Sequence, residues 1–245
     1  MKPVYRGETD SKRVARWLVW SCHQRLLGKY FVTNPNVFLA SRIGGDIDTL
    51  LEMGVSPDCV WAVEFSREQC EPLFAKAKKK GFRVFLEKIQ AVVERLAESE
   101  SIRSVYLDYC GNLCGTRSST QRVMVKMAPG SVVSITLFLG RELDGTVDRE
   151  AALIKQLRAA TKHRVTLVQS IRYMSDDEAS KGSAMQTWTF FIGDIPSRSK
   201  LRFDLTKLDV STLAKSEKEV RKLWLMAKKV ADVRSAAAVL ANINR

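Results

Sequence analysis

The sequence lacks several features, and each absence narrows the class of protein. No run of 18 or more uncharged apolar residues occurs in its 245 residues, so we expect no membrane-spanning helix and no membrane partner. The start, MKPVYRGETDSKR, has no apolar stretch of the secretory-signal type, which predicts an intracellular protein. Histidine is scarce: His23 and His163 are the two present, and we expect each to be packed or solvated.

Cysteine is present without the pattern of a disulfide framework or a zinc site. The five cysteines (Cys22, Cys59, Cys70, Cys110 and Cys114) are odd in number and lie in apolar surroundings. Free thiols in a reducing compartment fit this usage. Cys110 and Cys114 lie four residues apart, but no second cysteine pair accompanies them. We therefore expect no metal site.

Positive charge is abundant and unevenly placed. The formal net charge is +13. Residues 1–34 hold 7 Lys/Arg and 2 Asp/Glu, residues 197–245 hold 12 and 5, and the middle holds 21 and 20. The excess cations thus lie at the two ends. Such an asymmetry indicates a polyanion partner, a nucleic acid in particular, although a basic surface that serves only solubility gives the same totals.

Strand-like and helix-like segments alternate along the middle of the chain. Short apolar runs of strand type occur at 36–41, 59–65, 82–87, 104–110, 131–140, 164–174 and 185–195. Helical patterns separate the first six runs, whereas the last two are joined by the polar SDDEASKGSA, which is too short for a parallel crossover. We therefore predict an α/β fold with a seven-stranded, mostly parallel sheet, a reversed final strand and helices on both faces.

The two basic ends predict helical flanks. We expect an N-terminal helical extension over 1–34, an α/β domain over 35–196 and a C-terminal helical extension over 197–245. The segment 11–27 has an apolar stripe of helical spacing, and the tail after Ser216 has another with many lysines. If the stripes pack on the domain, the cations between them face solvent and phosphate. In the first segment these cations are Lys12, Arg13, Arg16 and Arg25.

Three successive strand-like runs end on a carboxylate. VWAVEF ends near Glu64, FRVFLEK near Glu87 and SVYLDYC near Asp108. This order of elements and acids, over about residues 35–196, resembles the class I S-adenosylmethionine-dependent methyltransferase family. The resemblance implies a Rossmann-like sheet with S-adenosylmethionine as the cofactor, bound across the carboxyl ends of the first four strands, where open α/β sheets bind ligands.

The turn after the first strand matches the family's glycine-rich loop, which binds the methionine part of the donor. The residues that match by position are Ala40, Ser41, Gly44, Gly45 and Asp46, and glycines there allow close backbone approach. Asp46 is expected to cap the next helix or to face the donor's amino group. The loop also departs from the pattern, because Ala40 and Arg42 replace two usual glycines and Phe38 replaces the usual acid.

The acids of the second and third strands match the positions that bind adenosine. Glu64 matches the acid that accepts hydrogen bonds from the ribose hydroxyls, and its two oxygens suit a vicinal diol. Phe65 follows it. Glu87 matches the acid that binds the adenine amino group, with Lys88 beside the ring. The plainer interpretation is that each acid only caps the helix that follows.

Asp108 matches the family position that faces both the methyl donor and the acceptor. We expect it to accept a hydrogen bond from an acceptor amine or hydroxyl, and Tyr109 to stack on an extruded base or simply to pack. DYCG lacks the Pro-Pro-aromatic sequence of many amino-directed enzymes. Cys110 as a nucleophile toward a pyrimidine lacks its usual proline neighbour. A ribose 2′-hydroxyl enzyme has a Lys-Asp-Lys-Glu set, which Asp108 with Arg141 and Glu142 matches in part.

Three hypotheses on function follow. The first is a methyltransferase that acts on RNA or DNA, at a base or sugar heteroatom, with the basic ends binding the polymer. The second is a methyltransferase-like subunit with a weakened cofactor site that binds nucleic acid, a protein partner or a second copy of itself; the altered first loop favours it. The third is a methyltransferase of small molecules or proteins.

Overall fold

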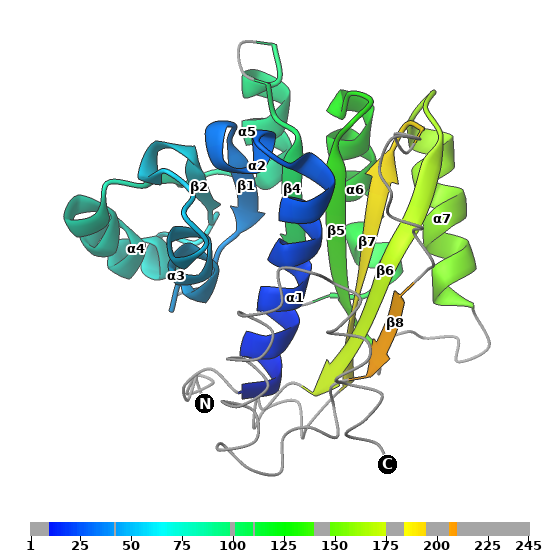
Figure 1. The fold of residues 1–245 in the computed structure, drawn as a ribbon, viewed down its shortest axis with the longest axis horizontal. Helices are drawn as coiled ribbons and strands as arrows, with labels where there is room; N and C mark the ends of the chain where they lie inside the picture. The colour runs from blue at the N-terminus through cyan, green and yellow to red at the C-terminus, as the bar shows by residue number, and fades with distance from the viewer. Residues whose placement is uncertain are drawn as a thin grey trace.

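A mixed eight-stranded sheet forms the centre of the computed structural model (Figure 1). The structure describes residues 10–41, 43–98, 101–109, 111–139, 148–174, 184–194 and 206–209. The strand order across the sheet is β3-β2-β1-β4-β5-β7-β6-β8, in which only β7 runs antiparallel to its neighbours. The strands are β1 (Asn36–Leu39), β2 (Val60–Val63), β3 (Arg83–Phe85), β4 (Ser104–Asp108), β5 (Val132–Phe138), β6 (Val165–Met174), β7 (Ala184–Ile192) and β8 (Thr206–Asp209).

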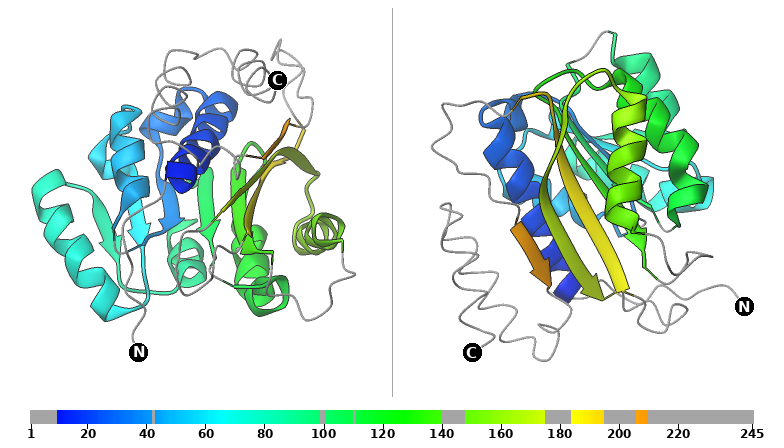
Figure 2. Two further views of the ribbon diagram at one scale, coloured as in Figure 1. Left: turned by 90° about the horizontal axis from the view of Figure 1, so that it is seen from below. Right: turned by 90° about the vertical axis from the view of Figure 1, so that its right-hand side faces the viewer.

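Helices cover both faces of this sheet, as Figure 2 shows in its view along the strands. The helices are α1 (Asp10–Leu27), α2 (Tyr30–Thr33), α3 (Gly45–Glu52), α4 (Arg67–Lys80), α5 (Ile89–Leu96), α6 (Leu113–Lys126) and α7 (Arg149–Ala160), with a short 3-10 turn η1 (Pro57–Cys59). Helices α1, α2, α3 and α4 share one hydrophobic cluster with one face of the sheet. Helices α5, α6 and α7 share a second cluster with the other face. We call them the α1 face and the α5–α7 face.

The two sheet faces differ in composition because successive residues of a strand point to opposite sides. In β5, Val133, Ile135 and Leu137 belong to the α5–α7 cluster. Their neighbours Ser134 and Thr136 are just as deeply buried, but they lie toward α1 and are polar. The sheet therefore has one almost purely apolar face and one face with buried hydroxyl groups.

Helix α1 crosses the polar face and contacts it through a stripe of polar side chains. Ser11 Oγ donates to the carbonyl of Met174 at the end of β6, over 2.9 Å. Near the C-terminal end of α1, His23 hydrogen-bonds Ser104 Oγ at 2.9 Å and Ser134 Oγ at 2.8 Å. The helix thus runs from the carboxyl edge of the parallel strands to their amino edge, and its first turns lie where the parallel strands end.

The predicted fold class is confirmed, including the reversed strand and the helices on both faces. Three short elements, α2, η1 and β8, were not predicted. The strand β8 pairs in parallel with β6, beginning at Gln169↔Thr206, and adds an eighth strand within the expected C-terminal extension. The amphipathic segment predicted after Ser216 lies outside the described residues. No described helix is both long enough and apolar enough to span a bilayer.

Candidate active site at the carboxyl edge of the sheet

Strands β1 to β4 are parallel, so their carboxyl ends meet at one edge of the sheet. The three acids predicted from the sequence lie at this edge. Across the sheet they come in the order Glu87 after β3, Glu64 after β2 and Asp108 at the end of β4, and the loop after β1 lies between the last two. Neighbouring strands are about 4.8 Å apart, which places the acids along one continuous row.

Asp108 is the most buried of the three acids, with 8% of its side chain exposed. Its Oδ2 lies 3.6 Å from Nζ of Lys12, which is in the first turn of α1. Its Oδ1 is buried and has no hydrogen-bond partner among the described residues. A buried oxygen of this kind is costly unless a donor reaches it, so a donor that arrives at Asp108 Oδ1 would be favoured.

Glu64 is half-buried and bound by backbone only. Its Oε1 accepts a hydrogen bond from the Ser66 amide at 2.8 Å, and no described Lys or Arg pairs with it. Burial raises the pKa of Glu64, while hydrogen bonds from the Ser66 and Phe65 amides oppose this rise. The next side chain, Phe65, is 70% exposed, which is unusual for a phenylalanine.

Glu87 is more exposed and is already part of an ion pair. Its Oε1 lies 2.5 Å from Nη2 of Arg95 on α5, and the side chains are 40% and 51% exposed. One carboxylate oxygen is used in this pair, and the second is left for another donor. Lys88 is exposed and is the N-terminal boundary residue of α5, without a side-chain capping bond. Its predicted place beside an adenine ring stays a prediction.

The loop after β1 has the tight backbone that its glycines predict. Gly44 has φ +64°, and a Cβ there would lie 2.8 Å from Cδ1 of Ile47, so a larger residue would be strained. The Gly44 amide donates to the Ser41 carbonyl at 2.9 Å. Lys76 of α4 binds the carbonyl of Gly44 at 3.1 Å. The loop is thus closed on itself and fastened to α4.

Ala40 and Gly45 complete the loop at its two ends. The Ala40 amide donates to the Val63 carbonyl at 2.9 Å, which continues the β1–β2 pairing one residue beyond the strand. Gly45 is buried and begins α3. Arg42 lies outside the described residues.

Asp46 has a different environment from the one the sequence suggested. It is 1% exposed, its Oδ2 lies 2.9 Å from Nε of Arg16, and its Oδ1 accepts a hydrogen bond from Trp20 Nε1 at 2.8 Å. Asp46 therefore fastens α3 to α1. Its expected place facing a donor amino group stays a prediction.

The same contact explains the phenylalanine at the usual acid position. Phe38 is fully buried, and its ring centroid lies 5.9 Å from that of Trp20. Because Trp20 fills the space over β1, an apolar partner is favoured there, and the buried acid of this region is Asp46 on the next helix.

In this structure, Tyr109 packs against its own domain, which is one of the two roles expected for it. Its ring packs against the α5–α7 cluster. Its hydroxyl group donates to Ser119 Oγ at 3.1 Å, and Ser119 Oγ in turn donates to Gln90 Oε1 at 2.9 Å. Burial raises the pKa of Tyr109. The stacking role on an extruded base stays a prediction, and it requires this hydrogen-bonded chain to open.

Two residues of the site were missed by the sequence analysis: Lys12 as the partner of Asp108 and Arg16 as the partner of Asp46. Both were predicted to face solvent, and for Arg16, which is 3% exposed, that prediction is wrong. The available signal was their spacing of four residues, which places them on one side of a helix. Nothing local in the sequence indicates that this side faces two acids.

The remaining predicted chemistry is untested or has no support. Cys110 lies outside the described residues, and Cys114 is a free, exposed cysteine. His23 is fully buried, and burial lowers its pKa to about 3, in line with a packing role. In the described ranges, no group of three His, Cys, Asp or Glu side chains has the arrangement of a metal site.

Comparison with known proteins gives a fold. No protein-family model and no curated protein matches the chain. A S-adenosylmethionine-dependent methyltransferase from Clostridium acetobutylicum ATCC 824 superposes with a TM-score of 0.51 at 13% identity, covering 76% of this chain and 94% of that one.

Two further solved structures are similar at TM-scores below 0.5. An O-methyltransferase from Bacillus cereus in complex with SAH has a TM-score of 0.48 at 13% identity, covering 77% of this chain and 84% of that one. An rRNA methylase from Streptococcus thermophilus has a TM-score of 0.45 at 12% identity, covering 71% and 95%. Strand order, the reversed β7 and the first superposition agree: the chain has the Rossmann-like fold of the class I S-adenosylmethionine-dependent methyltransferases.

Proposed function

We propose that this protein is an S-adenosylmethionine-dependent methyltransferase that methylates a hydroxyl group of a nucleic acid, and hence RNA. The observation that carries the proposal is the row of carboxylates at the carboxyl edge, which ends in Asp108 with its buried, unpartnered Oδ1 and the Lys12 ammonium beside it. The fold supports the cofactor class, and the charged pair supports the acceptor class.

The residues present fit the donor at two points. Glu64 is a half-buried carboxylate with which no described Lys or Arg pairs, and this suits two ribose hydroxyls. Phe65 offers an exposed ring face for adenine. When bound, S-adenosylmethionine supplies an electrophilic methyl group on a sulfonium, and these residues bind and orient it.

Asp108 and Lys12 fit the other side of the reaction. Asp108 Oδ1 accepts a hydrogen bond from the acceptor and thereby orients the acceptor lone pair toward the methyl group. As the new bond forms, the acceptor proton passes to Asp108 or through it to solvent. Lys12 Nζ lies 3.6 Å from Asp108 Oδ2, and it is close enough to act on charge that develops at the acceptor.

The sign of the Lys12 charge distinguishes oxygen from nitrogen as the acceptor. A hydroxyl oxygen that loses its proton gains negative charge, which a neighbouring ammonium stabilises. An amine that accepts a methyl cation gains positive charge, which the same ammonium disfavours. Within a nucleic acid strand, a free hydroxyl at every nucleotide is a property of RNA, through its 2′-OH. The Lys12–Asp108 pair therefore favours RNA over DNA.

A weakened subunit is the second candidate, and two observations favour it. Asp46 is neutralised by Arg16, and Glu87 is paired with Arg95, so two of the predicted donor ligands have internal partners. Such a protein binds RNA but transfers no methyl group.

Methyl transfer from a labelled donor tests the proposal. The full chain is incubated with labelled S-adenosylmethionine and, separately, with mixed RNA, mixed DNA, protein and a small-molecule extract. We expect label in RNA alone. Asp108→Asn keeps the shape and removes the charge, and we expect it to lower the rate by about 10²-fold or more. Lys12→Met is expected to lower the rate as well, whereas Lys12→Arg retains part of it.

The outcomes separate the candidates. Label in DNA or in a base amine contradicts the hydroxyl acceptor. Binding of S-adenosylhomocysteine and RNA without any label supports the weakened subunit, and label only in protein or small molecules contradicts the nucleic-acid substrate.

A further inference from the structure

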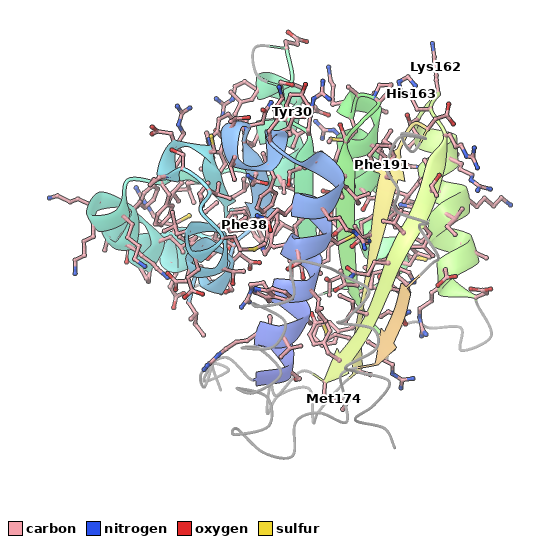
Figure 3. All side chains as sticks on the ribbon, in the orientation of Figure 1. Tyr30, Phe38, Lys162, His163, Met174 and Phe191 are labelled. Carbon is pink, nitrogen blue, oxygen red and sulfur yellow. The ribbon has the colours of Figure 1, made fainter. Side chains whose placement is uncertain are left out.

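The amino edge of the sheet, opposite the proposed active site, has a row of exposed cations. Figure 3 labels Tyr30, Lys162 and His163 at this end and Met174 at the other. Lys29 precedes α2, Arg83 begins β3, Arg103 immediately precedes β4, and Lys162 lies between α7 and β6. Lys29, Arg83 and Lys162 are exposed, and Arg103 is half-buried.

Two of these cations are arginines that lie over aromatic rings. The Arg103 guanidinium carbon is 4.9 Å from the centroid of Tyr30, and that of Arg83 is 5.1 Å from the centroid of Trp61. Stacking uses the flat face of the guanidinium, while its N–H groups point outward in the plane and stay available for hydrogen bonds. Such an arginine is held in place without being neutralised, which suits a planar, bidentate contact to a phosphate.

These two arginines differ from three others that carboxylates hold. Arg16 pairs with Asp46, Arg95 with Glu87 and Arg122 with Glu94. Among the described residues, Arg83 and Arg103 have no carboxylate within ion-pair distance; Arg103 donates only to Ser101 Oγ, at 3.3 Å. The guanidinium charges of Arg83 and Arg103 at the amino edge are thus not balanced by a described acid, in contrast to those of Arg16, Arg95 and Arg122.

The spacing of the two arginines suits a polymer backbone. They lie at the beginnings of β3 and β4, which are separated by β2 and β1 in the sheet. Three strand spacings of about 4.8 Å amount to roughly 14 Å. That is about four nucleotide steps at about 3.4 Å of helical rise. One strand of a nucleic acid can thus reach both guanidinium groups along the edge.

We propose that the amino edge of the sheet is a second nucleic-acid-binding surface, on which Arg83 and Arg103, flanked by Lys29 and Lys162, bind the phosphodiester backbone away from the reacting nucleotide. The inference rests on the proposed function in taking a nucleic acid as the partner. It adds a place of binding that the charged ends of the chain did not predict.

Fluorescence anisotropy with the full chain tests this surface. The probes are a labelled 20-nucleotide single-stranded RNA, the DNA of the same sequence and the corresponding duplexes, each titrated at several salt concentrations. The variants are R83Q, R103Q and the double variant, and the matched control is R122Q, which removes an exposed guanidinium already paired with Glu94. Circular dichroism and binding of S-adenosylhomocysteine report on the fold of each variant.

We expect R83Q/R103Q to weaken binding and to lower the steepness of log K against log salt by about 1.4 for single strands and about 1.8 for duplexes, as two lost phosphate contacts require. R122Q leaves both quantities unchanged. If the double variant loses more affinity for RNA than for DNA, the surface binds RNA in particular. If it loses the same affinity for both, the surface recognises the phosphodiester backbone alone.

The results that overturn the inference are distinct from failure of the proposed function. If wild type binds RNA and R83Q/R103Q binds it equally well with the same salt dependence, the amino-edge surface is wrong and the methyltransferase proposal stands. The same holds if R122Q loses as much affinity as the double variant. If wild type binds no nucleic acid, the substrate class and this surface both fail, while binding of S-adenosylhomocysteine still tests the donor site.

Discussion

The two faces of the sheet bind their helices through different interactions. On the α5–α7 face, Trp188, Phe190 and Ile192 of β7 pack with apolar helix residues. On the α1 face, Thr187 and Thr189 of the same strand form hydrogen bonds within a buried network. Apolar packing stabilises without fixing direction, whereas the polar network specifies how α1 must lie.

This difference matters because α1 carries residues of the proposed active site. The stripe Lys12, Arg16, Trp20 and His23 follows one side of the helix, and each member has a polar contact on the sheet or on α3. A register error of α1 would move Lys12 away from Asp108. The polar network thus fixes how α1 lies at the carboxyl edge, while both faces contribute apolar packing.

The largest expected loss of stability follows from breaking the Arg16–Asp46 ion pair. Asp46→Leu removes the carboxylate that pairs with the buried Arg16, and we expect the free energy of unfolding to fall by about 3–5 kcal/mol. The double variant Arg16→Met/Asp46→Leu removes both charges and is expected to recover most of this loss. Chemical denaturation of the four proteins in the cycle measures it, and equal losses in the single and double variants would refute the buried-pair account.

Adjacent residues of β5 provide a matched test of the two faces. Thr136→Val removes the oxygen that lies 3.1 Å from Tyr106 Oη and 2.5 Å from Thr187 Oγ1, which leaves buried hydroxyls unsatisfied and costs about 1–3 kcal/mol. Ile135→Val on the other face removes one methylene and costs about 0.5–1.5 kcal/mol. Urea unfolding compares them, and a more stable Thr136→Val protein would show that the network is not stabilising.

His23 makes the polar face sensitive to pH. Its folded pKa is about 3, below its ordinary value of 6.5, so the unfolded state binds the proton more readily. The contribution of neutral His23 to the free energy of unfolding is fully present above pH 6.5. It is lost as the pH falls toward 3, by at most about 1.4 kcal/mol per pH unit. We expect His23→Gln to be less stable at pH 7 and to lose this slope between pH 6.5 and 4. Parallel slopes for wild type and His23→Gln would contradict the assignment.

The smallest expected effect on stability is at Lys12. Its side chain is 28% exposed and 3.6 Å from Asp108, so Lys12→Met is expected to change the free energy of unfolding by about 1 kcal/mol or less. Thermal denaturation measures this. A small stability change together with a large loss of methyl transfer would separate the role of Lys12 in the reaction from its role in the fold, and a large stability change would instead make it part of the polar framework.

The sequence predicted features that depend on short-range pattern. Strand ends and helix starts are local, so the acids Glu64, Glu87 and Asp108 were placed at one edge correctly. The partners of these acids come from elements distant in sequence, and periodicity does not indicate which side of α1 meets which strand. The apolar stripe of α1 was recognised, but the buried polar stripe beside it was taken for a solvent face, because Lys and Arg are seldom buried unless they are paired.

The glycine-poor first loop shows the same limit. From the sequence alone, Phe38 looked like the loss of a donor ligand. In the structure it is the packing partner of Trp20, and Trp20 in turn holds Asp46. A substitution in a motif can thus follow from packing of a remote helix, which no inspection of the motif itself reveals.

Calorimetric titration of S-adenosylhomocysteine into wild type and Glu64→Gln tests the central claim, that an adenosyl ligand binds along the carboxyl edge. Since a hydrogen bond to a charged group contributes about 1.5–3 kcal/mol, we expect wild type to bind and Glu64→Gln to bind at least about tenfold more weakly, with unchanged unfolding behaviour. Equal affinity of the two proteins, or no binding heat from wild type at high concentration, would contradict the claim.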